Sequence, residues 1–413
     1  MTQLRETQPA AFEQTNYRPV DAETLAGAVS IVEDIRTAGE KAVRQHAERL
    51  GDLQAGDPIV IERGVLDDAF ASLEPEQRAL LERTKKRIEG FALAQRETLQ
   101  DLETPVTGGQ AGHRWIPARC VGAYAPGGRY PLPSSVLMTV IPARVAGVET
   151  VWVASPRPSQ VTLAAAALAG ADGLLAIGGA QAIASFCFGT FTSRTDLVVG
   201  PGNRWVTAAK KHLFGEMGID GLAGPSELLV IADDSAKPSL VAADLIAQAE
   251  HDVDAIPTLI TTHADLVPAV NAELARQLTG LPTAETASAA IERNGRSVVV
   301  ESLDEAARLS DRIAPEHLEL CVRDPEELAD KVRCYGGLFL GSLSAEVFGD
   351  YGFGPNHVLP TGGSARFQAG LSVATFLRAS TWLDVADASA REDAAALARL
   401  EGLEGHARAA LQR

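Results

Sequence analysis

Apolar residues in the first hundred positions recur every three or four residues, which is the spacing of amphipathic helices. One such stretch begins after Asp21, a residue type that caps helix N-termini, and continues to about Leu50. A second stretch runs from Pro75 to Leu93. The pattern therefore predicts that most of residues 20 to about 100 form surface helices.

From about Val121 the pattern changes to short, nearly continuous apolar runs that alternate with helical segments. Such runs, bounded by glycine, proline and aspartate, are typical of parallel strands buried on both faces. The tail from about Ser372 is rich in alanine and is predicted to be helical. We expect strands at residues 151–154, 174–177, 197–199, 228–232, 259–261, 298–300, 318–322 and 338–340.

Strands that alternate with helices predict an α/β fold in which helices cover parallel sheets, and these runs suffice for two sheets. The net charge of −17 argues against a nucleic-acid partner, because phosphate binding requires clustered Lys and Arg. No apolar stretch approaches the length of a membrane span, and the first residues lack the apolar core of a signal peptide. We therefore expect a cytoplasmic protein that binds neither nucleic acid nor membrane.

Glycine-rich loops flank several predicted strands, at residues 122–128, 178–181, 200–203 and 224–227. Each is either a tight turn or a place where a ligand approaches the backbone closely, since ligands of open α/β sheets bind at the carboxyl ends of strands. Asn203 precedes a predicted helix and is positioned to cap it or to contact a phosphate. No GxGxxG fingerprint is present, so the loops alone do not indicate NAD.

Four segments place metal-binding or proton-transferring side chains close together in sequence. Gln248 and His251 are three residues apart at the end of a predicted helix, so they share one face and form half of a metal site. Glu316 and His317 follow a proline that is expected to hold Ala314 in an extended conformation. Both side chains face one pocket only if the turn extends through them; otherwise the pair is structural.

The other two segments offer weaker indications. Asp350 and His357 share a loop too rich in glycine for a helix or a strand, and both are placed to reach a common site. His406 lies in a short polar stretch of the predicted C-terminal helical region. From its own neighbours it is a surface residue.

Around these residues the sequence resembles the histidinol dehydrogenase family. The resemblance covers about residues 25 to 413, and its motifs follow the family's order at nearly the family's spacing. They are GAYAPGGRYPLPSSVLMTVIPARVAGV, GGAQAIA, GPGNRWVTAAK, AGPSELLVIAD, IAQAEHD, APEHLEL, GDYGFGPNHVLPTGGSARF and EGLEGHA.

The resemblance implies oxidation of L-histidinol through the aldehyde to L-histidine, with two hydrides transferred to NAD. It assigns His317 as the general base and Glu316 as the acid/base that activates water against the aldehyde. One Zn²⁺ per subunit is implied, with the ligands Gln248, His251, Asp350 and His406. Those six residues also count among the substrate contacts, together with Ser226, His357 and Glu401. The implied cofactor contacts are Tyr124, Gln181 and Asn203.

The resemblance also implies an organisation of two incomplete Rossmann-like domains. An N-terminal extension would span residues 1–24, and a C-terminal helical segment, residues 372–413, would reach the partner of a homodimer with shared active sites. Residues 25–123 and 226–371 would form a main domain that carries the metal and the catalytic pair. A second domain, residues 124–225, would supply the cofactor loops.

Arg129 and Tyr130 follow the double glycine where histidinol-oxidising members of the family carry small residues. They resemble paralogues that oxidise other small alcohols, such as a sulfonated propanediol, and Arg129 is suited to an anionic group. The PLPSSVLM segment and Glu401 favour histidinol instead. Two other classes are a zinc hydrolase, disfavoured by the absence of HExxH, and a non-catalytic metal-binding or scaffold protein, disfavoured by Glu316 and His317.

Overall fold

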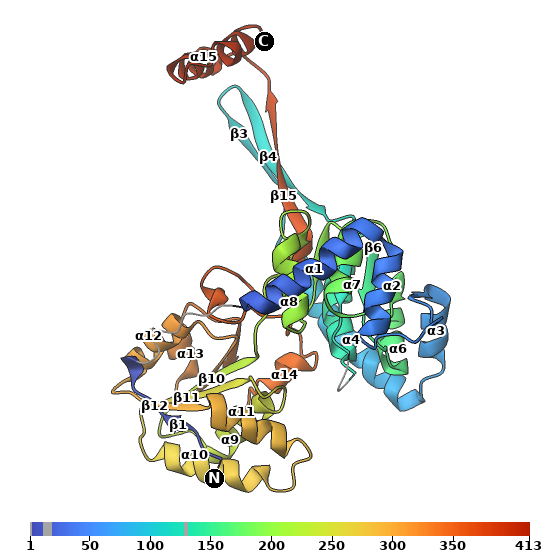
Figure 1. The fold of residues 1–413 in the computed structure, drawn as a ribbon. Helices are drawn as coiled ribbons and strands as arrows, with labels where there is room; N and C mark the ends of the chain where they lie inside the picture. The colour runs from blue at the N-terminus through green and yellow to red at the C-terminus, as the bar shows by residue number, and fades with distance from the viewer. Residues whose placement is uncertain (1, 11–18, 128–130) are drawn as a thin grey trace.

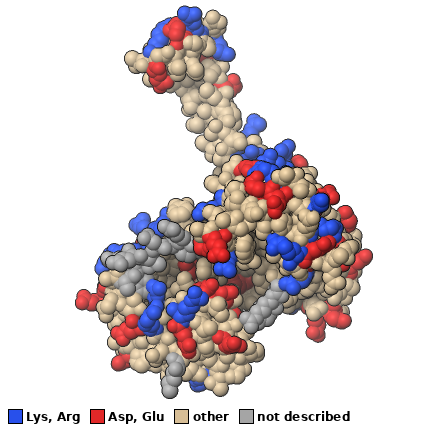
Figure 2. All heavy atoms as spheres, viewed as in Figure 1, with Lys and Arg blue, Asp and Glu red and all other residues tan. Residues whose placement is uncertain are grey.

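The computed structural model describes residues 2–10, 19–127 and 131–413. Two lobes lie next to each other, and a long arm extends away from both of them (Figure 1). The surfaces of the lobes carry charges of both signs, whereas the stalk of the arm is largely uncharged (Figure 2). No helix among the described residues is both long enough and apolar enough to cross a bilayer.

The first lobe is built on a six-stranded sheet in the order β1-β12-β11-β10-β13-β14, in which all neighbouring strands run parallel. The N-terminal segment contributes its edge strand. The strands are β1 (Arg5–Glu6), β10 (Glu227–Ala232), β11 (Ile256–Thr261), β12 (Arg296–Val299), β13 (His317–Cys321) and β14 (Gly337–Leu340).

Alternating residues of β10 face opposite sides of this sheet, as strand geometry requires. Leu228 and Val230 belong to the core formed with α9, α10 and α11, whereas Leu229 and Ile231 pack with α12 and α13. On β13, Leu318 and Leu320 lie on the α12 side, so the intervening residues face α9. The helices are α9 (Pro238–Ala249), α10 (Leu266–Leu278), α11 (Ala284–Asn294), α12 (Leu303–Ile313), α13 (Pro325–Ala329) and the single turn α14 (Val347–Asp350).

The second lobe contains a sheet in the order β2-β7-β6-β5-β8-β9, parallel except for β2. Its strands are β2 (Val60–Glu62), β5 (Cys120–Tyr124), β6 (Thr150–Ala154), β7 (Gly173–Leu175), β8 (Leu197–Val199) and β9 (Gly218–Ile219). The two parallel-sheet lobes confirm the predicted fold class. The boundaries of the lobes differ from the expected domains, however. The strands β2 and β5 were expected in one domain with residues 226–371, but they belong to the sheet formed by residues 124–225.

Helices from the first half of the chain surround the second sheet and share one apolar core with it. This explains the grouping, because α1 to α4 bury apolar residues in the same core as α5 to α8. The helices are α1 (Ala22–Ala38), α2 (Glu40–Arg49), α3 (Arg63–Ala71), α4 (Pro75–Glu97), α5 (Pro133–Ala146), α6 (Gln160–Ala169), α7 (Gly179–Phe188) and α8 (Arg204–Leu213).

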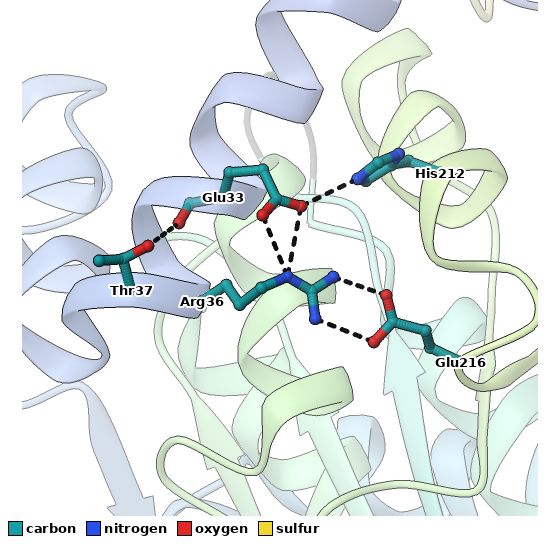
Figure 3. Close-up of polar contacts among 5 residues, drawn as sticks. All are labelled: Glu33, Arg36, Thr37, His212 and Glu216. Carbon is teal, nitrogen blue, oxygen red and sulfur yellow. Dashed lines mark hydrogen bonds and ion pairs between the residues drawn. The ribbon is translucent and has the colours of Figure 1, made fainter.

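A surface network of charged side chains joins α1 to α8 and the turn after it (Figure 3). Arg36 donates to both carboxylate oxygens of Glu216, and its Nε lies 3.1 Å from Glu33. His212 approaches the same Glu33, with Nε2 3.2 Å from the carboxylate. All of these groups are partly exposed, so the network mainly fixes the position of α1 and adds little stability.

The arm combines an antiparallel sheet with two helices, α15 (Arg391–Leu400) and α16 (Glu404–Leu411), at its tip. Its strands, in spatial order, are β15 (Leu377–Val385), β4 (Gly109–Pro117) and β3 (Leu102–Val106). The prediction of a wholly helical tail was therefore wrong over residues 377–385. Most of β15 is exposed and lacks a clear apolar alternation, and its pairing with β4 is a long-range contact that local pattern does not reveal.

Candidate active site

Several of the predicted site residues lie at the amino edge of the first sheet. Ser226 immediately precedes β10 and Glu316 immediately precedes β13, and the two strands pair with Leu228 opposite His317. Gln248 is on the last turn of α9, which runs back from the carboxyl edge and ends at the same edge as Ser226. These residues therefore gather at the amino edge, opposite to the edge where ligands of open α/β sheets usually bind.

Glu316 and His317 are both buried and lie close together, with 3.6 Å between the Glu316 carboxylate and His317 Nδ1. The bend extends through Glu316, whereas His317 is already the first residue of β13. Ala314 adopts a left-handed conformation with φ 51° and ψ 63°, so the prediction that it is extended was wrong. Ala314 is the C-cap of α12, and its N–H bonds the carbonyl of Ser310 to end that helix.

Glu227, the first residue of β10, fixes both members of the pair. Its carbonyl oxygen is 2.8 Å from His317 Nδ1, and its N–H donates to the Glu316 carboxylate at 2.8 Å. A carbonyl only accepts hydrogen bonds, so Nδ1 carries the proton and Nε2 of a neutral His317 keeps its lone pair. Nε2 is therefore the atom of His317 that can accept a proton.

Next to His317, three side chains are placed to hold a metal ion. One ligand atom from each of His251, Glu346 and Asp350 lies within 4.8 Å of the others. His251 Nε2 is 3.6 Å from Asp350, and Glu346 Oε1 is 3.9 Å from His317 Nε2. Imidazole nitrogen and carboxylate oxygen are donors that Zn²⁺ and similar divalent ions accept.

Unpartnered polar atoms also mark this region. Gln248 is fully buried, and neither the oxygen nor the nitrogen of its amide has a hydrogen-bond partner. His357 donates from Nδ1 toward the Asp350 carbonyl at 3.2 Å, while its Nε2 is buried without a partner. Buried polar atoms normally have partners, so these atoms are consistent with a site that binds a ligand.

His317 and His357 open into a cavity of about 850 Å³. Its walls come from both lobes: α4 contributes Phe91 and Gln95, and β14 contributes Phe339. The mixture of aromatic walls and a few polar groups is typical of small-molecule sites. The cavity thus provides space for a small molecule against the side chain of His317.

Burial is the largest cause of the pKa shifts of Glu316, His317 and Glu346. It lowers the pKa of His317 and raises the pKa of Glu316 well above its ordinary range, although Glu316 accepts a backbone hydrogen bond. The pKa of Glu346 is also well above normal, first because of burial and then because Asp350 lies near. At neutral pH, His317 is therefore neutral, as a proton acceptor must be.

The predicted cofactor contacts lie at one edge of the second sheet, after the parallel strands β5, β7 and β8. Tyr124 is buried, and its hydroxyl accepts the N–H of Gly179 at 3.2 Å. Asn203 caps α8 by accepting from two backbone N–H groups, which confirms its predicted capping role. Gln181 is buried and donates to Asp52 at 2.8 Å, leaving its amide oxygen without a partner.

Two pairs of residues singled out from the sequence are not found at this site. Glu401 and His406 are exposed and belong to the tip region of the arm, so one chain does not bring them to His251 and Asp350. Arg129 and Tyr130, which raised the possibility of a different substrate, lie outside the described residues.

The model of the family described as histidinol dehydrogenase matches residues 17–413. The chain belongs to this family. It is therefore an enzyme of the dehydrogenase class, and the recognition made from the eight motifs is confirmed.

Individual relatives agree with this assignment. Histidinol dehydrogenase of Thermus thermophilus is 45% identical over 399 residues, which cover 95% of this chain and 94% of that protein. The protein of the same name from Cereibacter sphaeroides is 44% identical over 91% of this chain and 88% of its own length.

Among solved structures, histidinol dehydrogenase from Elizabethkingia anophelis matches with a TM-score of 0.91 at 31% identity, covering 99% of this chain and 97% of that one. An acetylating aldehyde dehydrogenase from Geobacillus thermoglucosidasius matches with a TM-score of 0.52 at 14% identity, covering 91% and 93%. The latter likeness concerns the fold alone.

Sequence reasoning missed four acidic residues in or near the candidate sites. Glu346 lies one helical turn before Asp350, a spacing that places two carboxylates on one face and that the abundance of glycine concealed. Asp52 is more than a hundred residues from Gln181, so no local signal connects them. Glu319 and Asp244 are carboxyl groups buried in the first lobe, on β13 and α9.

We expect Glu319→Gln to stabilise the metal-free protein more at high pH than at low pH. Burial, and then the charge of Asp244, raise the pKa of Glu319 to about 9 in the folded protein, whereas the unfolded carboxyl ionises near its ordinary value of 4.5. Between those values the folded state holds the extra proton, so the stability of the parent protein falls as pH rises. Glutamine removes that loss.

Urea denaturation at about pH 5.5 and about pH 8.5 measures this effect, with a stability difference expected to grow by on the order of 1–3 kcal/mol. The exposed Glu301→Gln is the matched control and is expected to show no such growth. A stability difference for Glu319→Gln that does not change with pH contradicts the prediction.

Proposed function

We propose that this chain oxidises L-histidinol through L-histidinaldehyde to L-histidine, the last step of histidine biosynthesis, and that it requires Zn²⁺ and NAD. The observation that carries the proposal is the placement of His317: its Nε2 is free to accept a proton, its side chain lines the cavity, and it lies beside a group of side chains able to bind a metal. Membership of the histidinol dehydrogenase family supports the substrate.

The residues present fit a divalent ion. The donor set of Gln248, His251 and Asp350 has two oxygen donors and one nitrogen, and the Gln248 amide is buried with no other use for its oxygen. When bound, the ion supplies a positive charge that orients the amine and imidazole nitrogens of the substrate. Ser226 and His357, at the same edge, are the further substrate contacts that we propose.

His317 and Glu316 carry the proton chemistry in this proposal. His317 accepts the hydroxyl proton at Nε2, because the carbonyl of Glu227 keeps the other proton on Nδ1. The resulting imidazolium lies beside the Glu316 and Glu346 carboxyl groups, and it is stabilised by whichever of them is ionised. Glu316 then takes the proton from the water that adds to the aldehyde, since its raised pKa allows proton transfer near neutral pH.

We assign the cofactor to the edge of the second sheet where Tyr124, Gln181 and Asn203 lie. Two molecules of NAD, bound there one after the other, would each accept one hydride. The partnerless amide oxygen of Gln181 is a suitable acceptor for a cofactor N–H or O–H, and Asp52 holds that amide in one orientation. Tyr124 fixes the start of α7 through Gly179, and Asn203 lies exposed at the start of α8.

The arm is the basis for proposing a homodimer. Leu383 and Leu400 are 66% and 86% exposed on it, and the stalk carries little charge, so it presents an apolar surface suited to a second copy. Glu401 and His406 are also exposed there. We propose that they complete the active site of the partner, with His406 as a zinc ligand and Glu401 as a substrate contact.

Absorbance of reduced nicotinamide with L-histidinol as sole substrate tests the function. We expect two equivalents of NADH per histidine formed, and His317→Ala is expected to reduce turnover by about 10²–10⁴-fold while zinc remains bound. The exposed His263→Ala is the control and should behave as the parent. Turnover of a sulfonated diol with none of histidinol assigns the paralogue function instead, and hydrolysis without NAD indicates the zinc hydrolase.

Mixing of inactive subunits tests whether the active site is shared. His317→Ala removes a residue from the lobes of a subunit, and His406→Ala removes one from its arm. If the arm acts on the partner, a dimer of the two variants therefore contains one intact active site. Random association should restore about a quarter of the parental activity. A mixture of His317→Ala with Glu316→Gln, which both damage the body, should stay inactive. If the first mixture also stays inactive, the arm does not act across the interface.

A further inference from the structure

The side chain of Glu227 is buried where three segments meet, and it has no part in the chemistry described so far. Glu227 is 8% exposed. Its Oε1 accepts the N–H of Gly362 at 2.9 Å, and its Oε2 accepts the N–H of Glu316 at 3.3 Å. Burial raises the pKa of this carboxyl to about 7, although the two N–H groups oppose the shift. Burying an ionisable group lowers stability, so this carboxylate is a candidate for a role in the reaction.

The two donors explain why a carboxylate suits this position. Both groups that face the Glu227 carboxylate are backbone N–H donors, and a carboxylate offers an acceptor oxygen to each of them. A glutamine would present its NH₂ group to one of the two and leave that N–H without an acceptor. The side chain of Glu227 therefore joins the residue before β13 to the loop at Gly362, which adopts a φ of 61°.

Glu316 is the residue that these contacts hold in place. Its carbonyl oxygen accepts the N–H of Gly337 at 2.8 Å, and its own N–H is bound by Glu227, so both polar groups of its backbone are held. In return, the N–H of Glu227 donates to Oε2 of Glu316 at 2.8 Å. The two glutamates, 89 residues apart in the sequence, thus bind each other reciprocally. Because Pro315 lacks an N–H, Glu316 provides the first N–H after the C-cap Ala314.

Glu316 and His317 depend on different parts of Glu227. The backbone carbonyl of Glu227 holds His317, at 2.8 Å from Nδ1. The side chain of Glu227 binds the backbone of Glu316 instead. A substitution of that side chain should therefore displace Glu316 and leave the contact of His317 intact.

We propose that Glu227 is a positioning residue for Glu316, and that its side chain is needed more for the second oxidation than for the first. This inference rests on the proposed function, in which His317 takes the proton of the alcohol and Glu316 takes a proton from the water that adds to the aldehyde. A small displacement of a group that transfers a proton slows that step steeply. The first hydride transfer uses His317, which the backbone of Glu227 still holds.

Rapid mixing of the zinc-loaded dimer with NAD tests the proposal, at about pH 8.5, where the Glu227 carboxyl is mostly ionised. L-Histidinol reports the first hydride transfer as the early formation of NADH, and L-histidinaldehyde supplied as substrate reports the second. We expect Glu227→Gln to slow aldehyde oxidation about tenfold or more, and the first hydride transfer less than about threefold. Glu227→Asp keeps the charge on a shorter side chain, so it should hold the two N–H groups less well and slow the same step by a smaller factor.

Glu319→Gln is the matched control, because Glu319 is also a buried glutamate of this lobe and its carboxylate has no hydrogen bond to Glu316. It should leave the ratio of the two rates within about threefold of the parental ratio. Combining Glu227→Gln with Glu316→Gln provides a second readout. Since Glu227 acts through Glu316, adding Glu227→Gln to Glu316→Gln should slow aldehyde oxidation less than about twofold further.

Thermal melting verifies that each variant folds, and Glu227→Asp carries the same test if Glu227→Gln does not fold. Equal slowing of both steps by a folded variant overturns the proposal, because the side chain then supports the site as a whole. Parental rates for both steps overturn it as well, and so does an undiminished effect of Glu227→Gln in the Glu316→Gln background. If the parent forms no NADH from L-histidinol, the proposed function fails, and this inference fails with it.

Discussion

Carboxylates held together away from water repel one another unless they bind protons or a cation, and this constraint governs the first lobe. Glu316, Glu319 and Glu346 are almost wholly buried there, and the ion pairs of the site are with His251, His317 and His357. Without metal the carboxyl groups are relieved by raised pKa values. A divalent cation is the alternative source of charge balance, so metal binding and folding stability are coupled.

The residues proposed for the reaction lie at the amino edge of the first sheet and at the carboxyl edge of the second sheet. The first lobe places Glu316 and His317 at the amino edge, where the backbone of Glu227 determines which nitrogen of the imidazole is free. The second lobe places Gln181 at a carboxyl edge, where Asp52 determines which end of the amide is free. In both lobes a neighbouring residue, fixed by strand or loop geometry, sets the orientation of the group that meets the ligand.

Local sequence was informative where it reflects a repeated physical requirement. All eight expected strands are present because buried parallel strands need continuous apolar runs, and Asp21 caps α1 as its residue type indicates. Features that depend on pairing between distant parts of the chain could not be predicted. The exposed strand β15 is defined by its pairing with β4. The lobe to which β2 and β5 belong is likewise defined by the sheet that they join. The motif order identified the family, but Glu346 emerged only when the turn of α14 placed it beside Asp350.

The central claim is that a metal ion is shared between the body of one subunit and the arm of another, next to His317. Anomalous diffraction at the zinc edge, from crystals of the zinc-loaded dimer with L-histidinol, locates the ion directly. We expect one anomalous peak per subunit, bonded to His251 and Asp350 of one chain and to His406 of its partner. A peak away from His251 and Asp350, or His406 facing solvent in both chains, would contradict it.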